Sequence, residues 1–229
     1  MNFGSVLPRL CLGGICLLLA GCGSGDGNDR AVTANIAAES NSGSQIGGGA
    51  TSREAPGLDP LHPQVKISTS LGEIVVQLDA EQAPITVKNF LFHASNGHYE
   101  GTVFHQVIKD YVALGGGYDG KMVEKPTHFA IRNEAYNQLR NKRGTIAMAR
   151  QPDIIDSSTC QFFFNLADNV ELDHTSRQSA KEFGYCVFGQ VVEGLEVLDR
   201  ISQAPVADRG DWTAVPVQPV VIHSIVPIR

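Results

Sequence analysis

The stretch FHQVI places two polar side chains that could do chemistry between apolar residues. His105 could act as a base for a nucleophile such as Ser157 or Cys160, and Gln106 offers two neutral N–H donors. A strand histidine beside Phe104 is more often a packed structural residue, so we give proton transfer little weight. The histidines and cysteines show no H-E-x-x-H pattern and no clustered spacing, and we therefore predict no metal site.

A glycine-rich run, GGGYDG at 115–120, formally fits the G-x-G-x-x-G fingerprint of dinucleotide-binding proteins. That fingerprint must open a helix, so that the pyrophosphate meets free backbone N–H groups. Here KMVEKPTH follows, which is not an amphipathic helix, and Pro126 would disrupt one. We predict instead a tight turn beside a surface groove, and no cofactor.

The overall composition is that of an ordinary globular protein. Of the 229 residues, 42% are hydrophobic and 18% are charged, and the formal net charge is -6. The acidic balance and the lack of a long basic run disfavour a nucleic-acid partner.

Residues 1–21 have the layout of a secretion signal, in which Arg9 precedes an apolar run too short to span a bilayer. The sequence LAGC at 19–22 resembles the lipobox of bacterial lipoproteins, which implies cleavage before Cys22 and lipidation of that residue. A plain signal peptide with an incidental cysteine is the alternative. Gly23, rather than Asp, follows the cysteine, and this resembles the pattern of lipoproteins directed to the outer membrane. We therefore expect a protein anchored outside the cytoplasm and facing the periplasm.

Residues 22–58 are rich in Gly, Ser, Asn and Ala, with hardly any large apolar side chain. Such a segment cannot bury enough surface to offset its ordering entropy, which indicates a flexible tether. Residues 59–229 then form one domain. Cys160 and Cys186 lie in it, and in an oxidising compartment they could form a bridge or remain free thiols.

The domain shows many short β-like segments and few helices. Helices are predicted at 83–92 and 193–203, with inner faces formed by Val87, Phe90, Leu91, Ala94, Leu195, Leu198 and Ile201. Strands are predicted at 65–70, 73–78, 101–108, 144–149, 161–166, 185–191 and 217–226. This pattern favours a mainly β protein with a closed antiparallel barrel over a doubly wound sheet.

Six blocks, taken together and in order, resemble the cyclophilins, the peptidyl-prolyl isomerases that act on X-Pro bonds, and most closely the bacterial periplasmic kind. They are FHQVI at 104–108, GGG at 115–117, RNEA at 132–135, RGTIAMAR at 143–150, CQFFFN at 160–165 and FGYCVFG at 183–189. The resemblance implies a closed eight-stranded antiparallel β-barrel capped by two α-helices.

The resemblance also implies a substrate site. Phe163 and Leu172 would wall a pocket for the proline ring, with Tyr111 and Val112 where the family usually has Phe and Met. Further residues placed there by the resemblance are Phe104, His105, Leu114, the main chain of Ala149, Arg150, Gln161, which would hold substrate backbone, and Tyr185, with Glu171 in place of a usual aromatic on the rim.

Gln106 is the main departure from the family pattern, because the catalytic donor there is Arg. Leu114 likewise replaces a Gln that normally orients that Arg, while Arg150 could act as a substitute donor. Hydrogen bonds from charged groups contribute roughly 1.5 to 3 kcal/mol, against about 0.5 to 1.5 for neutral ones. We therefore expect catalysis slowed on the order of 5 to 30-fold.

The sequence thus leaves two main hypotheses open. The first is a monomeric, lipid-anchored prolyl isomerase of reduced activity that acts on X-Pro segments of unfolded or exported proteins. The second is a non-catalytic, proline-binding or chaperone-like module that keeps the groove but has lost the donor. An anchored structural protein without a functional groove is a third.

Overall fold

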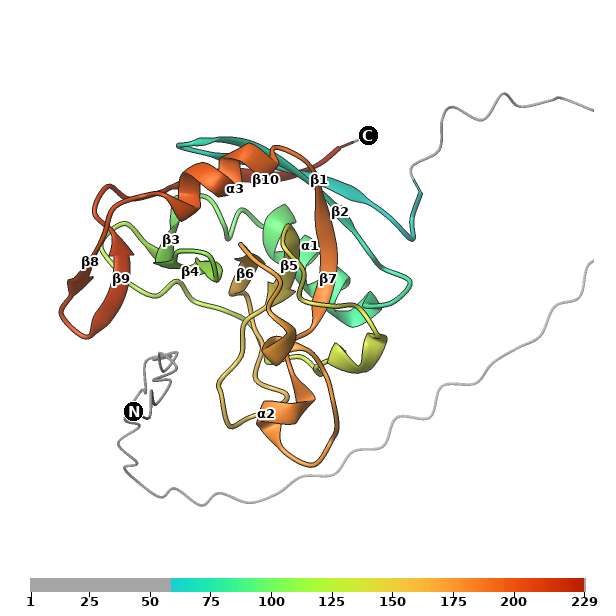
Figure 1. Cartoon of the computed structure of the whole chain (residues 1–229). Coiled ribbons are helices and arrows are strands. Elements are labelled where there is room, and N and C mark those ends of the chain that lie inside the picture. The colour runs from blue at the N-terminus through green and yellow to red at the C-terminus, as the bar shows by residue number, and fades with distance from the viewer. Residues whose placement is uncertain (1–58, 229) are drawn as a thin grey trace, which may run out of the picture. The chain divides into compact units, whose positions relative to one another are not determined.

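The computed structural model describes residues 59–228, and eight strands of this part form one curled antiparallel sheet (Figure 1). Its order is β10-β1-β2-β7-β5-β6-β4-β3. The strands are β1 (Gln64–Thr69), β2 (Gly72–Leu78), β3 (Thr102–Ile108), β4 (Val112–Asp119), β5 (Thr145–Met148), β6 (Phe162–Asn165), β7 (Val187–Glu193) and β10 (Ile222–Ile228). The mainly β prediction is confirmed.

The expected closure of the barrel is not confirmed. The edge strands β10 and β3 form no continuous ladder and are joined by one isolated bridge, Val103 to Val221. Two backbone hydrogen bonds flank it, from Gly101 to Ile222 at 2.9 Å and from Phe104 to Val220 at 3.0 Å. The connection before β10 runs irregularly here, so the sheet curls round to meet itself without pairing strand to strand.

Three α-helices and two 3-10 turns complete the described part. Pro84 starts the longest helix, where its missing N–H costs nothing because the first turn has no intrahelical acceptor. Phe90 of this helix packs against the rings of Phe162 and Phe188, while the predicted core residue Leu91 is only partly buried. The elements are α1 (Pro84–Ser95), η1 (Ala135–Asn137), η2 (Val170–Leu172), α2 (Ala180–Phe183) and α3 (Leu195–Ser202), which buries Val197, Leu198 and Ile201. No helix among residues 59–228 is long and apolar enough to cross a membrane.

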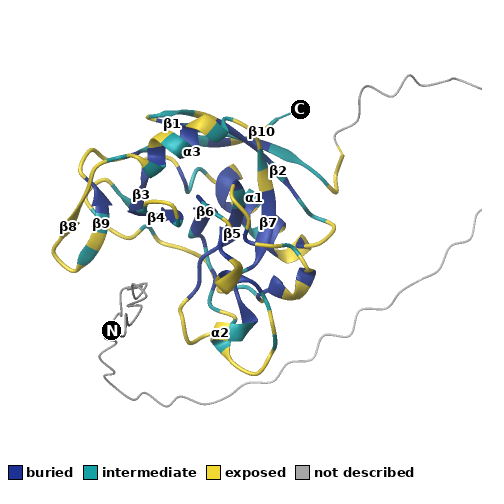
Figure 2. Cartoon of the chain, viewed as in Figure 1, coloured by how far each residue is buried: buried dark blue, intermediate teal, exposed yellow. Residues whose placement is uncertain are grey.

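The buried side chains form two clusters, because successive residues of a strand point to opposite faces. On β6, Phe162 and Phe164 enter the main core with α1, whereas Phe163 joins a smaller cluster on the other face. Figure 2 shows this burial along β4, β5 and β6. The smaller cluster consists of Val112, Leu114, Ala147, Ala149, Phe163, Leu172 and Val187.

The three glycines at 115–117 lie inside strand β4, so the prediction of a turn there was wrong. Neighbouring side chains occupy the space that a Cβ would need. A Cβ on Gly116 would lie 2.8 Å from the Phe162 ring, and one on Gly117 would lie 2.5 Å from Gln161 Cγ. Gly116 also has φ +85°, which glycine adopts without strain. These glycines are therefore packing positions of a strand.

A two-stranded hairpin after α3 was not predicted. It comprises β8 (Val206–Arg209) and β9 (Trp212–Pro216), and β9 lies beside β3. The last strand accordingly begins at Ile222, later than the predicted start at 217.

Cys160 and Cys186 are both buried and both free, so the open question of a bridge is answered against it. The predicted signal segment 1–21, the lipidation site Cys22 and the tether 22–58 lie outside the described residues.

Candidate active site

A small apolar pocket lies over the smaller core cluster. Val112 and Leu114 alternate on β4, and Phe163 on β6 lies directly opposite Leu114, so the three side chains share one face of the sheet. The pocket has a volume of about 10 Å³, room for about one water molecule, so a whole proline ring enters only if the lining side chains move apart. Its lining, which we call the apolar pocket, is Tyr111, Val112, Leu114, Phe163, Leu172 and Tyr185. The structure thus brings together six of the predicted site residues.

The two tyrosines of the apolar pocket, Tyr111 and Tyr185, are uncharged. The ring of Tyr185 meets Phe163 edge-on, with 5.6 Å between centroids and an interplanar angle of 80°. Burial, followed by the charge of Glu171, raises the pKa of Tyr111 to about 12. Both pocket tyrosines therefore stay neutral near physiological pH, because burial also raises the pKa of Tyr185.

Gln106 sits at the border of the apolar pocket. It pairs with Leu114 across β3 and β4, and only 7% of its surface is exposed. Its Nε2 donates to the side-chain Oγ1 of Thr213 at 3.0 Å and to the Thr213 carbonyl at 3.3 Å. Leu114 offers no polar atom, so the hairpin residue Thr213 is the side-chain partner that the structure gives to this amide.

A second small cavity adjoins the apolar pocket through their shared residue Leu114. Its volume is about 10 Å³, close to that of one water position. Two of its lining residues have a buried side-chain atom without a hydrogen-bond partner, Nδ1 of His105 and Oε1 of Gln161. We call it the amide cavity, lined by His105, Gln106, Leu114, Tyr118, Gln161, Trp212 and Thr213. Unpaired buried polar atoms are costly, which marks the cavity as a place prepared for a polar group.

His105 is unsuited to proton transfer at neutral pH. Burial lowers its pKa to about 4, so the ring is neutral and its charged form is strongly disfavoured. The ring packs against Tyr118 at 4.8 Å and Trp212 at 5.7 Å between centroids. The structural interpretation of this histidine therefore fits better than a catalytic one.

Arg150 cannot act as the substitute donor. Its guanidinium is buried, and its N–H groups donate to the carbonyls of Gly184 at 3.0 Å, Gln151 at 2.8 Å and Pro152 at 2.8 Å, and also to Ala180. Its Cζ lies 4.6 Å from the centre of the Tyr185 ring. Arg150 supports the wall of the apolar pocket from behind.

Two other predicted substrate residues, Phe104 and Ala149, do not line the apolar pocket. Phe104 belongs to the main core, next to Phe162 and Phe164, and does not line the apolar pocket. The pairing of β3 with β4 shifts register between Phe104 and Gln106, so these two residues do not share a face although they lie two apart in the strand. Ala149 is buried in the smaller cluster, and its N–H donates to the Gln161 carbonyl at 2.9 Å, which fixes Gln161 beside the amide cavity.

Sequence reasoning missed the hairpin residues Trp212 and Thr213, and Tyr118. Trp212 packs on Tyr118 with 4.6 Å between ring centroids. The one available signal was the single tryptophan of the chain in an otherwise polar stretch, and this does not reveal its partners.

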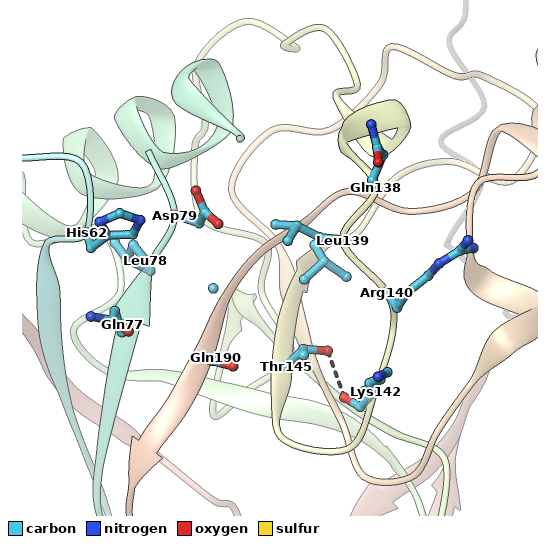
Figure 3. A pocket seen from close by; sticks show the side chains of 12 residues that line it. His62, Gln77, Leu78, Asp79, Gln138, Leu139, Arg140, Lys142, Thr145 and Gln190 are labelled. Carbon is cyan, nitrogen blue, oxygen red and sulfur yellow. Dashed lines mark hydrogen bonds between the residues drawn. The ribbon is translucent and has the colours of Figure 1, made fainter. Parts of the chain in front are cut away.

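A much larger cavity, of about 440 Å³, is lined by residues of β2, β5, β7 and the segment 138–142 (Figure 3). Leu139 lies near its centre, with His62 and Asp79 on one side and Arg140 and Lys142 on the other. None of the predicted site residues lines it. Size alone does not make a site, and we place the chemistry at the two smaller cavities, where apolar walls and a donor meet.

No group of three or more His, Cys, Asp or Glu side chains within residues 59–228 has an arrangement that could hold a metal ion.

Comparison with known proteins gives a consistent result. The family model described as "Cyclophilin type peptidyl-prolyl cis-trans isomerase/CLD" matches residues 64–226. Peptidyl-prolyl cis-trans isomerase A of Dickeya dadantii (strain 3937) is 48% identical over 160 residues, covering 70% of this chain and 82% of that protein. Peptidyl-prolyl cis-trans isomerase B of Escherichia coli (strain K12) is 42% identical over 161 residues, covering 70% and 97%.

Among solved structures, a cyclophilin type peptidyl-prolyl cis-trans isomerase of Cryptosporidium parvum matches with a TM-score of 0.60 and 24% identity. The match covers 73% of this chain and 98% of that one. The same parasite protein has also been crystallised in the presence of the dipeptide Ala-Pro. At this identity the likeness supports the fold alone.

Proposed function

The chain belongs to the cyclophilin-type peptidyl-prolyl cis-trans isomerase family, an isomerase enzyme family, and from that premise we propose that it assists the folding of exported proteins. It acts, as a monomer, on exposed X-Pro bonds of unfolded segments. The observation that supports this best is the apolar pocket with the Gln106 amide next to it, joined through Leu114. Neither nucleic acid nor a cofactor has a part in the proposal.

The proposed reaction needs only a grip on the proline and one donor. Rotation about X-Pro is slow because amide resonance must be broken, a barrier of roughly 18 to 20 kcal/mol. As the bond twists, the proline nitrogen pyramidalises and gains a lone pair. A hydrogen-bond donor aimed at that nitrogen stabilises the twisted state more than either planar state, which is catalysis by differential binding.

Gln106 takes the part of this donor in our proposal. Its amide is uncharged and partly engaged by Thr213, so it stabilises the developing lone pair less than a guanidinium would. Gln161 has a buried, unpaired Oε1 that suits a backbone N–H of the substrate. We expect a working isomerase, slower than members with Arg at this position by about 5 to 30-fold.

The second candidate is a proline-binding module without turnover. The observation that favours it is the same hydrogen-bond pair, because a donor occupied by Thr213 has less capacity for the substrate. The pocket would then retain proline peptides without accelerating their isomerisation.

The test is a protease-coupled isomerisation assay on an Ala-Pro tetrapeptide with wild type, Gln106→Arg, Gln106→Ala and Phe163→Ala. We expect measurable turnover in wild type, a gain in kcat for Gln106→Arg, a loss for Gln106→Ala and a loss of peptide binding for Phe163→Ala. Wild type at the uncatalysed rate, with Gln106→Arg active, would favour the binding module. A fast wild type that Gln106→Arg leaves unchanged would refute the role of the Gln106 amide.

We further propose that Cys22 carries lipid and anchors the protein to the outer membrane, facing the periplasm. The support is the LAGC sequence behind a short apolar run. Labelling of the full chain with a radioactive fatty acid in a bacterial host should mark wild type and not Cys22→Ser, which should appear in the soluble periplasmic fraction. Equal labelling of both, or membrane retention of Cys22→Ser, would exclude this anchor.

A further inference from the structure

Gln106 has no polar side chain opposite it in its own sheet. The residue opposite it on β4 is Leu114, which has no hydrogen-bonding side-chain atom. A glutamine amide turns about several single bonds, and a donor contributes to catalysis only when it is held in place before the reaction. Some other residue must therefore fix the amide.

The hairpin of β8 and β9 supplies such a residue. Oγ1 and the carbonyl oxygen of Thr213 both accept from Gln106 Nε2, at 3.0 and 3.3 Å. Two acceptors on this side determine which end of the amide faces the hairpin, because turning it over would set Oε1 against a carbonyl. Since both acceptors belong to one residue, a single amide hydrogen can serve both, and the second hydrogen stays available.

The hairpin is irregular at the position of Thr213. Ala207 pairs with Val215 and Arg209 pairs with Trp212. Two residues of β9, Thr213 and Ala214, therefore lie opposite the single residue Asp208 of β8. This is a β-bulge, which redirects side chains out of the regular alternation.

The backbone at the bulge is also strained. Ala214 has φ +53°, an uncommon conformation for a residue with a Cβ, and its N–H donates to the Asp208 carboxylate at 3.1 Å. The φ of Ala214 helps to set the peptide plane that carries the Thr213 carbonyl. Such a conformation persists only where its surroundings enforce it.

Trp212 attaches the hairpin to the site. Its ring packs on Tyr118 and His105, next to the amide cavity, at 4.6 and 5.7 Å between centroids. The residue before Thr213 is therefore held against β3 and β4, which fixes the distance from Thr213 to Gln106.

We propose that Thr213 is a positioning residue of the isomerase: a bulge anchored by Trp212 aims its hydroxyl and carbonyl at the Gln106 amide, in place of the polar partner that Leu114 cannot provide. The remaining amide hydrogen is then directed to the substrate. The role rests on the proposed function, with Gln106 as the donor.

The test compares Thr213→Val, which keeps the shape and loses the hydroxyl, with Thr213→Ser, which keeps the hydroxyl. Asp211→Asn, in the turn of the same hairpin, is the matched control. We expect Thr213→Val to lower kcat about two- to fivefold with KM unchanged, and Thr213→Ser and Asp211→Asn to retain wild-type kcat. In a Gln106→Ala background, Thr213→Val should have no further effect, because the two residues act as one unit.

A second measurement does not depend on turnover. In NMR spectra, the two side-chain amide protons of Gln106 should be distinct and shifted in wild type and in Thr213→Ser, and should move toward free-amide positions in Thr213→Val. A wild type without turnover would contradict the proposed function, and the amide signals would still show whether Thr213 holds Gln106. A rise in kcat for Thr213→Val, equal losses in both backgrounds, or unchanged amide signals would overturn the positioning role.

Discussion

Arg150 shows how a charged residue near a site can serve structure rather than chemistry. Four backbone carbonyls accept from its guanidinium, and its side chain stacks on Tyr185. Removing a donor from buried acceptors costs their full desolvation penalty, about 1 to 3 kcal/mol each. The guanidinium N–H groups are therefore engaged by these backbone carbonyls and hold the local chain in place.

We expect Arg150→Met to lower the free energy of unfolding by about 1 to 3 kcal/mol, because the buried Gly184 carbonyl loses its donor and three partly buried carbonyls lose theirs. It should also raise KM for proline peptides, since Tyr185 loses its support. Arg140→Met is the control: Arg140 is 57% exposed and pairs with Asp173 at 3.4 Å, so its loss should cost under about 1 kcal/mol. Urea unfolding measures both, and similar losses for the two variants would contradict this assignment.

The sequence points to candidate site residues, but it does not reveal their partners. Gln106 and Leu114 stand out because they occupy the positions where the resemblance implies Arg and Gln. Thr213 is 107 positions away from Gln106 in the chain, on a hairpin with no local signature. Its contact depends on a bulge and on Trp212, which are tertiary features.

At the scale of elements, strand β4 was misread because glycine is ambiguous between turns and tightly packed strands. Gly116 and Gly117 differ in what limits them. Gly116 has a positive φ and faces the Phe162 ring, whereas Gly117 is limited by the side chain of Gln161 alone. The sequence gives the same letter for two different constraints.

Alanine at these two positions should therefore have different effects. Gly116→Ala should lower the free energy of unfolding by about 2 kcal/mol or more, because the left-handed backbone and the core ring both oppose a Cβ. Gly117→Ala should change stability less but displace Gln161, and so raise KM for proline peptides several-fold. Thermal unfolding and isomerisation kinetics on both variants test this, and the reverse pattern would contradict it.

At the scale of the whole molecule, local patterns located most strands and both longer helices, because their periodicities are local properties. The closure of the sheet was not predictable in the same way. It depends on how the edges β10 and β3 meet, and that is set by the irregular connection ahead of β10, with one bridge at Val103. The hairpin of β8 and β9 was missed because β8 is fully exposed and lacks an apolar alternation.

Buried histidines make the stability of the whole fold depend on pH. Burial lowers the pKa of His93, His98 and His105, the last to about 4. Near pH 6.5 these histidines therefore bind protons in the unfolded chain but stay neutral in the folded chain. Stability is then fully present above about pH 6.5 and falls as the pH drops toward 4. The exposed His62, whose pKa is raised by its hydrogen bond to Asp59, acts in the opposite direction, but solvent screens it.

His105 alone, shifted from 6.5 to about 4, accounts for about 3 kcal/mol of stability lost across this range. We therefore expect the free energy of unfolding in urea to decrease steeply from pH 7 to pH 4.5 in wild type. His105→Asn should reduce that slope whatever it does to stability at pH 7, because the slope counts protons and not contacts. His223→Asn, on the exposed part of β10, is the control for a histidine substitution outside the amide cavity. Equal slopes for wild type and His105→Asn would mean that the fold admits a charged ring beside Trp212, and the amide cavity would then have to be open to water.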